Sequence, residues 1–117
     1  MGMVSMFGLF NRGGAADTLS CAEVRSLMDK GEITLVDVRE ANEWANGRIP
    51  GAIHMPLSRL GGSFAKIPTD KPVVLYCLAG GRSAQALSMA RGAGLEGLRH
   101  MGGGIQDWAR NGFPIVR

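Results

Sequence analysis

Short runs of apolar and β-branched residues alternate with helical patterns along this chain, and this alternation limits the possible folds most strongly. The clearest strand is predicted at Pro72–Tyr76, where a proline is tolerated at the start and the rest is apolar. Strands that alternate with helices of this length are typical of βαβ units. The sequence therefore predicts an α/β domain with a central parallel sheet that helices cover on both faces.

The same signals place the other elements. Ser20 followed by Glu23 forms a capping box that starts a first helix, which ends before Gly31. Further strands are expected at Ile33–Val38, Ile53–Met55 and Leu98–Met101, and further helices at Glu40–Asn46, Leu57–Ala65, Ser83–Ala93 and Ile105–Arg110. Ligands of such sheets bind beyond the carboxyl ends of the strands, which is where Cys77 falls.

Length and composition fit one compact domain. The chain has 117 residues, of which 45% are hydrophobic and 20% charged, with a formal net charge of +3. Its basic residues are scattered, so nucleic acid is not an expected partner. Residues 1–16 are partly apolar and are expected to form a flexible leader before a folded domain over residues 17–117. The apolar part of this leader is too short to span a bilayer, and no integral membrane segment is expected.

The chain has two cysteines, Cys21 and Cys77. They are too few for a disulfide framework and lack the paired spacing of a zinc site. We therefore expect no metal and a reducing compartment, the cytoplasm, while the sequence leaves a bridge between the two cysteines open. Cys21, in the first helix, is expected to be a buried spectator.

Cys77 opens a glycine-rich turn that suits a reactive thiolate. The turn reads Cys77-Leu78-Ala79-Gly80-Gly81-Arg82-Ser83, and an alanine-rich helical pattern follows it. Its N–H groups can point inward and the helix adds the positive end of its dipole, so that an anionic sulfur is stabilised there. Only four residues separate Cys77 from Arg82, which makes a small cradle suited to a single sulfur atom.

Four motifs follow one another along the chain. They are Asp37-Val38-Arg39-Glu40 with Glu43-Trp44, then Gly47-Arg48-Ile49-Pro50-Gly51-Ala52-Ile53-His54, then the Cys77 turn, then Gly102-Gly103 with Trp108. From about Thr18 to Pro114 this order resembles the single-domain rhodanese family of sulfurtransferases. The resemblance implies a rhodanese-like, three-layer α/β domain and a catalytic cysteine that carries persulfide sulfur. Arg48 departs from the histidine that many members have there, and we infer no catalytic loss from it.

The predicted site combines the turn with two supporting residues. Cys77 is the expected nucleophile; the substrate-binding residues are Leu78, Ala79, Gly80, Gly81, Arg82 and Ser83; Asp37 and Arg39 support them. Cys77 would attack the outer sulfur of a donor such as thiosulfate, and cyanide or a thiol would then take that sulfur from the Cys77 persulfide. No cofactor, general acid or general base is required, because neither leaving group must be protonated.

Several residues have two possible roles. Arg82 either binds the donor's sulfonate oxygens, which we favour, or pairs with a carboxylate. Asp37 is expected to pair with an arginine or receive loop N–H groups, and Arg39 either draws anions or forms a supporting ion pair. His54 and the two tryptophans are expected to pack rather than to react. The three glycines 102–104 are only a weak signal for phosphate binding.

Two other functions remain open. The first is a non-enzymatic sulfur carrier that docks on its partner through the apolar leader. The second is a Cys-dependent phosphatase or arsenate reductase, although phosphatases on this fold resemble a pattern with five residues between the cysteine and the arginine. The expected partners are a small sulfur-donor anion and a thiol acceptor, with a thioredoxin-like or other sulfur-relay protein as one candidate.

Overall fold

The computed structural model describes residues 17–117, and its core is a parallel sheet. Within these residues the strands are β1 (Thr18–Leu19), β2 (Thr34–Asp37), β3 (Ile53–His54), β4 (Val73–Tyr76) and β5 (Arg99–Met101). Their order in the sheet is β1-β5-β4-β2-β3, and every pair is parallel. The predicted α/β fold is confirmed, whereas the leader predicted over residues 1–16 lies outside the described residues.

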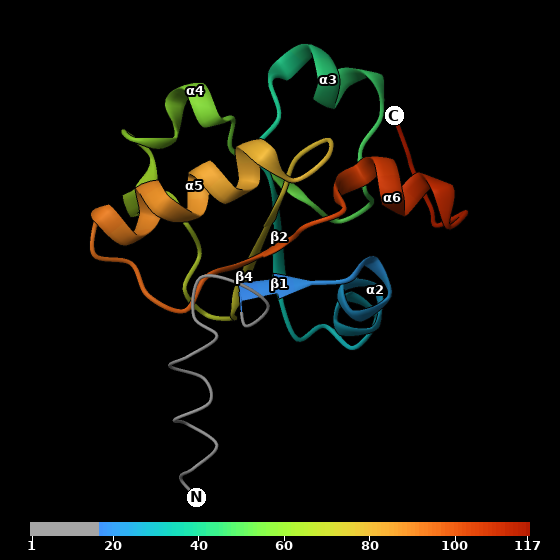
Figure 1. Cartoon of the computed structure of the whole chain (residues 1–117), viewed down its shortest axis with the longest axis horizontal. Coiled ribbons are helices and arrows are strands. Elements are labelled where there is room, and N and C mark those ends of the chain that lie inside the picture. Colours follow the sequence, from blue (N-terminus) through green and yellow to red (C-terminus); the bar gives the residue numbers. More distant parts are fainter. Residues whose placement is uncertain (1–16) are drawn as a thin grey trace, which may run out of the picture.

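Helices cover both faces of the sheet. They are α2 (Cys21–Asp29), α3 (Ala41–Asn46), α4 (Leu57–Leu60), α5 (Gly81–Gly92) and α6 (Gly104–Arg110), with a 3₁₀ turn η2 at Phe64–Lys66. Figure 1 shows α4 and α5 on one side of the sheet, α2 and α6 on the other, and α3 at one end. Of the helices in residues 17–117, none is long and apolar enough to cross a membrane.

The continuous apolar strands follow from this burial on both faces. Successive side chains of a strand point to opposite faces of the sheet. Leu35 accordingly packs in the cluster that includes α2 and α6, and the next residue, Val36, packs in the cluster that includes α4 and α5. The central strand β4 is buried at all four positions, with Val74 and Leu75 in opposite clusters. Strand β4 is therefore held rigidly up to its carboxyl end.

The main differences from the predicted elements lie at one shortened helix, one helix start and one additional strand. The helix expected over Leu57–Ala65 stops at Leu60, because Gly61 and Gly62 disfavour further helix, and the chain resumes as η2. Helix α5 begins at Gly81, two residues before the expected Ser83. Strand β1 was not predicted, since two residues are too few for an alternating pattern; its pairing with β5 forms it.

A buried ion pair closes the carboxyl end of β2. Arg39 Nη2 lies 2.7 Å from Asp37 Oδ2 and Arg39 Nε lies 3.1 Å from both carboxylate oxygens, while the Arg39 N–H donates to Oδ1 at 2.8 Å. The same Nη2 donates to the Gly47 carbonyl at 2.7 Å. Asp37 is fully buried and Arg39 is 5% exposed. Asp37 thus pairs with an arginine, as predicted, and the pair ties β2 to the segment after α3.

We predict that Arg39→Ala lowers the free energy of unfolding by about 3–5 kcal/mol, because it leaves the Asp37 carboxylate buried without its partner. Arg110→Ala is the matched control. Arg110 lies 4.0 Å from Asp107 and its side chain is 68% exposed, so its loss is expected to cost less than about 1 kcal/mol. Urea denaturation measures both, and equal losses would contradict a structural role for the buried pair.

Candidate active site

Cys77 directly follows β4 at the carboxyl edge of the sheet, between the ends of β2 and β5. The loop from Cys77 to Gly80 leads into α5, whose N-terminus faces the same region. Figure 1 shows this loop at the end of the sheet where α3 also lies. Only 1% of Cys77 is exposed. The sulfur therefore lies at the base of the loop, with the positive end of the α5 dipole beside it.

Main-chain N–H groups of the loop surround the Cys77 sulfur. The Gly80 N–H donates to Sγ at 3.1 Å and the Ser83 N–H at 3.3 Å. The Ser83 hydroxyl oxygen lies 3.6 Å from the sulfur, and the Ala79 N–H also contributes to lowering the pKa of Cys77. The inward-pointing amides expected from the sequence are thus present, and they favour a negative charge on Sγ.

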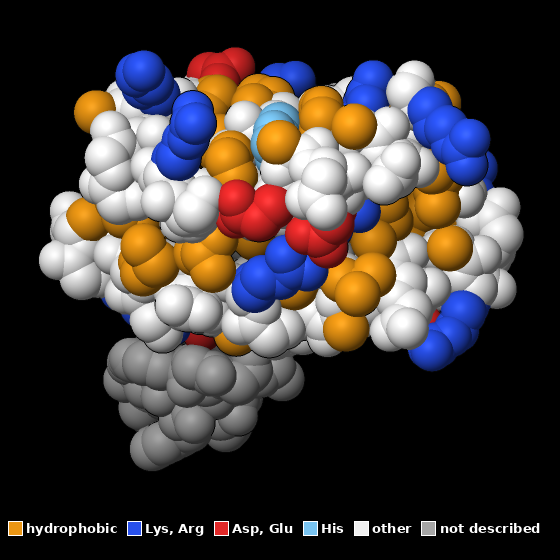
Figure 2. Space-filling model, turned by 90° about the horizontal axis from the view of Figure 1, so that it is seen from above, with side chains coloured by type: hydrophobic (Ala, Val, Ile, Leu, Met, Phe, Trp, Pro, Cys, Tyr) orange, Lys and Arg blue, Asp and Glu red, His pale blue; other side chains and the backbone are white. Residues whose placement is uncertain are grey.

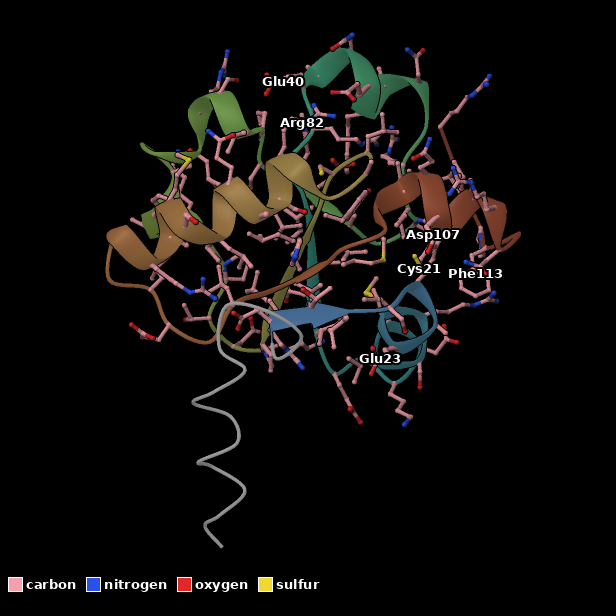
Figure 3. The ribbon with its side chains drawn as sticks, in the orientation of Figure 1. Cys21, Glu23, Glu40, Arg82, Asp107 and Phe113 are labelled. Atoms are coloured by element: carbon pink, nitrogen blue, oxygen red, sulfur yellow. The ribbon has the colours of Figure 1, made fainter. Side chains whose placement is uncertain are left out.

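The two cysteines differ in pKa although both are buried and neither forms a disulfide. Burial alone raises the pKa of Cys77, but the hydrogen bonds from Ser83, Gly80 and Ala79 outweigh burial and leave its pKa lowered. Burial and the nearby Asp107 carboxylate raise the pKa of Cys21 to about 11. Figure 3 shows Cys21 and Asp107 on facing sides of α2 and α6. The environment therefore favours a thiolate at Cys77 and a thiol at Cys21.

Helix α6 fixes the orientation of the first two peptide groups of the loop. The Ile105 N–H donates to the Cys77 carbonyl at 2.9 Å, and the Gln106 N–H donates to the Leu78 carbonyl at 3.0 Å. In a trans peptide the C=O of one residue and the N–H of the next point in opposite directions. Because the Leu78 carbonyl faces α6, the Ala79 N–H faces the sulfur.

Gly104 at the start of α6 and Gly80 in the loop allow this close approach. A Cβ on Gly104, which has a φ of +66°, would lie 2.1 Å from the Leu78 carbonyl oxygen. A Cβ on Gly80, with a φ of +103°, would lie 2.3 Å from the Gly102 carbonyl oxygen. Any larger residue at these positions would push the loop away from α6. The glycine run that the sequence offered as a weak phosphate signal therefore packs against the loop.

Arg82 forms an ion pair at the edge of the site. Its Nη1 and Nη2 lie 2.6 and 2.9 Å from the two carboxylate oxygens of Glu43 in α3. This fork of hydrogen bonds from Arg82 lowers the pKa of Glu43 to about 2. Figure 2 shows the molecule from above, with acidic and basic side chains gathered near the centre of the face in view. Figure 3 shows Arg82 close to Glu40 near the top of the molecule. Arg82 thus has a carboxylate partner, and its binding of a donor stays a prediction.

An open groove of about 430 Å³ runs beside the loop. Its apolar lining is Leu78, Ile105, Ala109 and Ile115, with Asn46 and Gln106 as polar members. Leu78 is 44% exposed and Ile115 is 42% exposed, so both present apolar side chains to solvent. The groove therefore offers apolar contact area beside the loop that begins at Cys77.

The remaining sequence candidates pack as expected. His54 stacks on Trp44 with ring centroids 4.7 Å apart, and its Nε2–H donates to the Arg39 carbonyl at 2.7 Å. Trp108 is buried, and its indole N–H donates to the Pro114 carbonyl. No group of three or more metal-ligating side chains occurs within residues 17–117. None of these aromatic and histidine contacts includes the Cys77 sulfur.

His100 is a further residue near the site, because its Nδ1 lies 2.8 Å from the Ser83 hydroxyl oxygen. His100 falls in the expected strand Leu98–Met101, and no pattern in the sequence links it to Ser83. The pairing of β5 beside β4 brings the two together.

We predict that Gly104→Ala lowers the free energy of unfolding more than Gly112→Ala and also raises the pH at which Cys77 becomes reactive. Both glycines have positive φ, but a Cβ at Gly112 would meet nothing within 4 Å. The control should therefore lower the free energy of unfolding by about 1–2 kcal/mol from backbone strain alone. Gly104→Ala should lower it by about 1–3 kcal/mol more, because the new Cβ would overlap the loop. Urea denaturation and the pH dependence of Cys77 alkylation test this. Equal effects of the two substitutions would show that the approach of α6 does not shape the loop.

Comparisons with known proteins agree with this geometry. Residues 20–111 match the Rhodanese-like domain. A sulfurtransferase of Allochromatium vinosum is 40% identical over 90 residues, which cover 77% of this chain and 84% of that protein. Human thiosulfate:glutathione sulfurtransferase is 35% identical over 107 residues, covering 80% of this chain and 93% of the human protein.

A solved structure and two longer relatives complete the comparison. The crystal structure of a rhodanese-related protein from Thermoplasma volcanium has a TM-score of 0.77 and 31% identity, and the match covers 85% of this chain and 96% of that one. Two other curated relatives are longer, and this chain spans 56% and 26% of their lengths. The family match and the similarity across most of the first two relatives lead to one conclusion: this chain belongs to the rhodanese-like family, whose members among these relatives include sulfurtransferases.

Proposed function

We propose that this protein takes a sulfane sulfur from thiosulfate or a persulfide donor and passes it to a thiol or to cyanide through a persulfide on Cys77. The family and its sulfurtransferase relatives support sulfur transfer in general. The observation that carries the finer proposal is the cradle of N–H groups around Sγ, with Gly80 N at 3.1 Å and Ser83 N at 3.3 Å. Such a cradle stabilises a charged sulfur without any group that must donate or accept a proton.

In the first step the Cys77 thiolate attacks the outer sulfur of thiosulfate. A new S–S bond forms on Sγ, the S–S bond of the donor breaks, and sulfite leaves with its electron pair. The product is a Cys77 persulfide whose terminal sulfur is anionic. The lowered pKa of Cys77 supports this step, because more of the cysteine is thiolate at neutral pH.

In the second step an acceptor thiolate or cyanide attacks the terminal sulfur, and the Cys77 thiolate leaves. A thiol with a lower pKa is a better leaving group. The same loop N–H groups that stabilise the attacking thiolate in the first step therefore also stabilise the leaving thiolate in the second. The scheme predicts ping-pong kinetics, since sulfite departs before the acceptor reacts.

The loop argues against phosphatase or arsenate reductase chemistry. Its N–H donors already contact the cysteine sulfur, and four residues separate Cys77 from Arg82. The guanidinium of Arg82 forms its fork on Glu43, whereas binding of a tetrahedral phosphate needs such a fork on the phosphate oxygens. We therefore expect no hydrolysis of an aryl phosphate.

The groove beside Leu78 favours an acceptor with apolar surface near its thiol, such as a sulfur-relay protein. Arg39 and Glu43, the charged groups in its lining, are both paired, with Asp37 and Arg82 respectively.

The sulfur-carrier alternative shares the Cys77 persulfide and differs in turning over small molecules poorly. Deletion of residues 1–14 separates the two: loss of transfer to a protein, with thiosulfate:cyanide turnover unchanged, would make the leader a docking element. Two free cysteines are consistent with a reducing compartment, and we place the protein in the cytoplasm.

We predict that incubation with thiosulfate adds one sulfur atom to the protein and that a thiol then removes it. Intact-mass spectrometry measures this directly. Cys77→Ser should abolish both the mass gain and sulfur transfer, because the serine hydroxyl is not ionised at neutral pH. Cys21→Ser is the matched control and should retain both, since the Cys21 sulfur lies between α2 and α6. A mass gain that persists in Cys77→Ser would reject the mechanism.

We also predict opposite effects of substitutions at the two ends of the Arg82–Glu43 pair. Arg82→Ala should raise the KM for thiosulfate about tenfold, equivalent to about 1.4 kcal/mol, and lower kcat less, because the donor loses a charged partner. Glu43→Gln should lower that KM, because it frees Arg82 while the glutamine oxygen can still accept from the Glu40 N–H. Steady-state kinetics provides the measurement, and an unchanged KM in Arg82→Ala would remove Arg82 from the donor site.

A further inference from the structure

A line of polar side chains runs from the Cys77 sulfur to the edge of the sheet. The Ser83 hydroxyl lies 3.6 Å from Sγ and 2.8 Å from His100 Nδ1, and His100 Nε2 lies 3.3 Å from the Thr18 hydroxyl. Ser83 is fully buried and His100 is 9% exposed. Helix α5, strand β5 and strand β1 each contribute one member. The His100 imidazole therefore has a neighbouring hydroxyl at each of its two nitrogens, and these hydroxyls come from two different elements.

The Ser83 hydroxyl has one proton and three possible acceptors. These are the Cys77 sulfur at 3.6 Å, the Gly80 carbonyl oxygen at 3.2 Å, and His100 Nδ1 at 2.8 Å if that nitrogen carries no proton. The shortest of these contacts is the one with His100 Nδ1. The Ser83 proton can point at the sulfur only when this nitrogen carries a proton and donates to the Ser83 oxygen. A hydrogen bond to an ionised acceptor is stronger than one to a neutral carbonyl. When His100 is a donor, only the sulfur and the Gly80 carbonyl remain as acceptors. The Ser83 hydroxyl then donates to a Cys77 thiolate in preference to the Gly80 carbonyl.

We propose that His100 is a positioning residue of the sulfur-transfer reaction: its Nδ1–H donates to the Ser83 oxygen and so keeps the Ser83 hydroxyl proton directed at the Cys77 sulfur. This inference rests on the proposed function of Cys77. His100 itself touches neither donor nor acceptor. It acts twice in each cycle, because Cys77 is a thiolate both when it attacks the donor and when it leaves the persulfide.

The surroundings of His100 suit this role. Burial lowers its pKa, and the charges of Asp17 and Arg91, which pair with each other, act on it in opposite directions. Burial thus favours the neutral ring, and in the proposed arrangement its proton lies on Nδ1 while Nε2 accepts from the Thr18 hydroxyl. A protonated ring would still carry the Nδ1–H, so the direction of the Ser83 hydroxyl does not depend on the charge of His100. At the sulfur, Arg82 contributes the nearby positive charge.

Two substitutions at position 100 separate the two ring nitrogens. Asparagine can place its amide N–H₂ near the position of Nδ1 and donate to Ser83, whereas glutamine reaches the position of Nε2, next to Thr18. We expect His100→Gln to raise the midpoint pH of Cys77 alkylation by iodoacetamide by about one unit, and His100→Asn to leave it near the value of the parent protein. The parent should be Cys21→Ser, so that only Cys77 is alkylated.

A double substitution tests whether the effect passes through Ser83. In a Ser83→Ala background, which should itself show a raised midpoint, His100→Gln should cause no further shift. An equal shift with and without Ser83 would overturn the proposal, as would equal midpoints for the asparagine and glutamine variants. If His100→Gln does not fold, nitrogen NMR of the imidazole in the unsubstituted protein decides the question: a proton on Nδ1 is expected, and a neutral ring with its proton on Nε2 would overturn it.

Alkylation does not require sulfur transfer, so its outcome is independent of the proposed function. A shifted midpoint in a protein that never gains a sulfur from thiosulfate would reject the function and keep the contact between His100, Ser83 and Cys77. A persulfide that forms normally, with no shift in His100→Gln, would keep the function and reject the role of His100.

Discussion

The hydrogen bonds between the start of α6 and the carbonyls of Cys77 and Leu78 hold the active loop in its functional shape. A loop of this length could equally turn its carbonyls toward the sulfur, where they would repel a negative charge. Because N–H groups at the start of α6 donate to those two carbonyls, the N–H groups of the same peptides, those of Leu78 and Ala79, point away from α6. Gly80 and Gly104 make the approach possible, since a Cβ at either would overlap a backbone oxygen. The chemistry at Cys77 thus depends on packing between two segments that are distant in the sequence.

The contrast between Cys77 and Cys21 shows how the chain sets the reactivity of a thiol. Both side chains are almost fully buried, so exposure does not distinguish them. At Cys77 several N–H groups more than offset the cost of burying a charge, whereas at Cys21 the Asp107 carboxylate adds to that cost. If His100 directs the Ser83 hydroxyl as proposed, a side chain beyond the loop adds a further hydrogen bond to the same sulfur.

Local patterns predicted much of the fold and the position of Cys77 directly after β4. The apolar run of β4, the Ser20 capping box and the glycine-rich turn each lie within a few residues, and the structure confirms them. Contacts between distant segments were harder to predict. The Arg82–Glu43 pair was open as one of two alternatives, and the contact of His100 with Ser83 had no signal at all, because only the order of strands in the sheet brings β5 beside β4.

We expect the N–H groups around the Cys77 sulfur to lower its pKa and so to favour its thiolate. The most direct test of this expectation is the difference in ultraviolet thiolate absorbance between the protein and its Cys77→Ser variant, followed as the pH is raised. Because Cys21 contributes equally to both, the difference reports Cys77 alone. We expect a midpoint below the ordinary thiol value of about 8.5. A midpoint at or above that value would contradict it, because burial would then outweigh the hydrogen bonds that the loop donates.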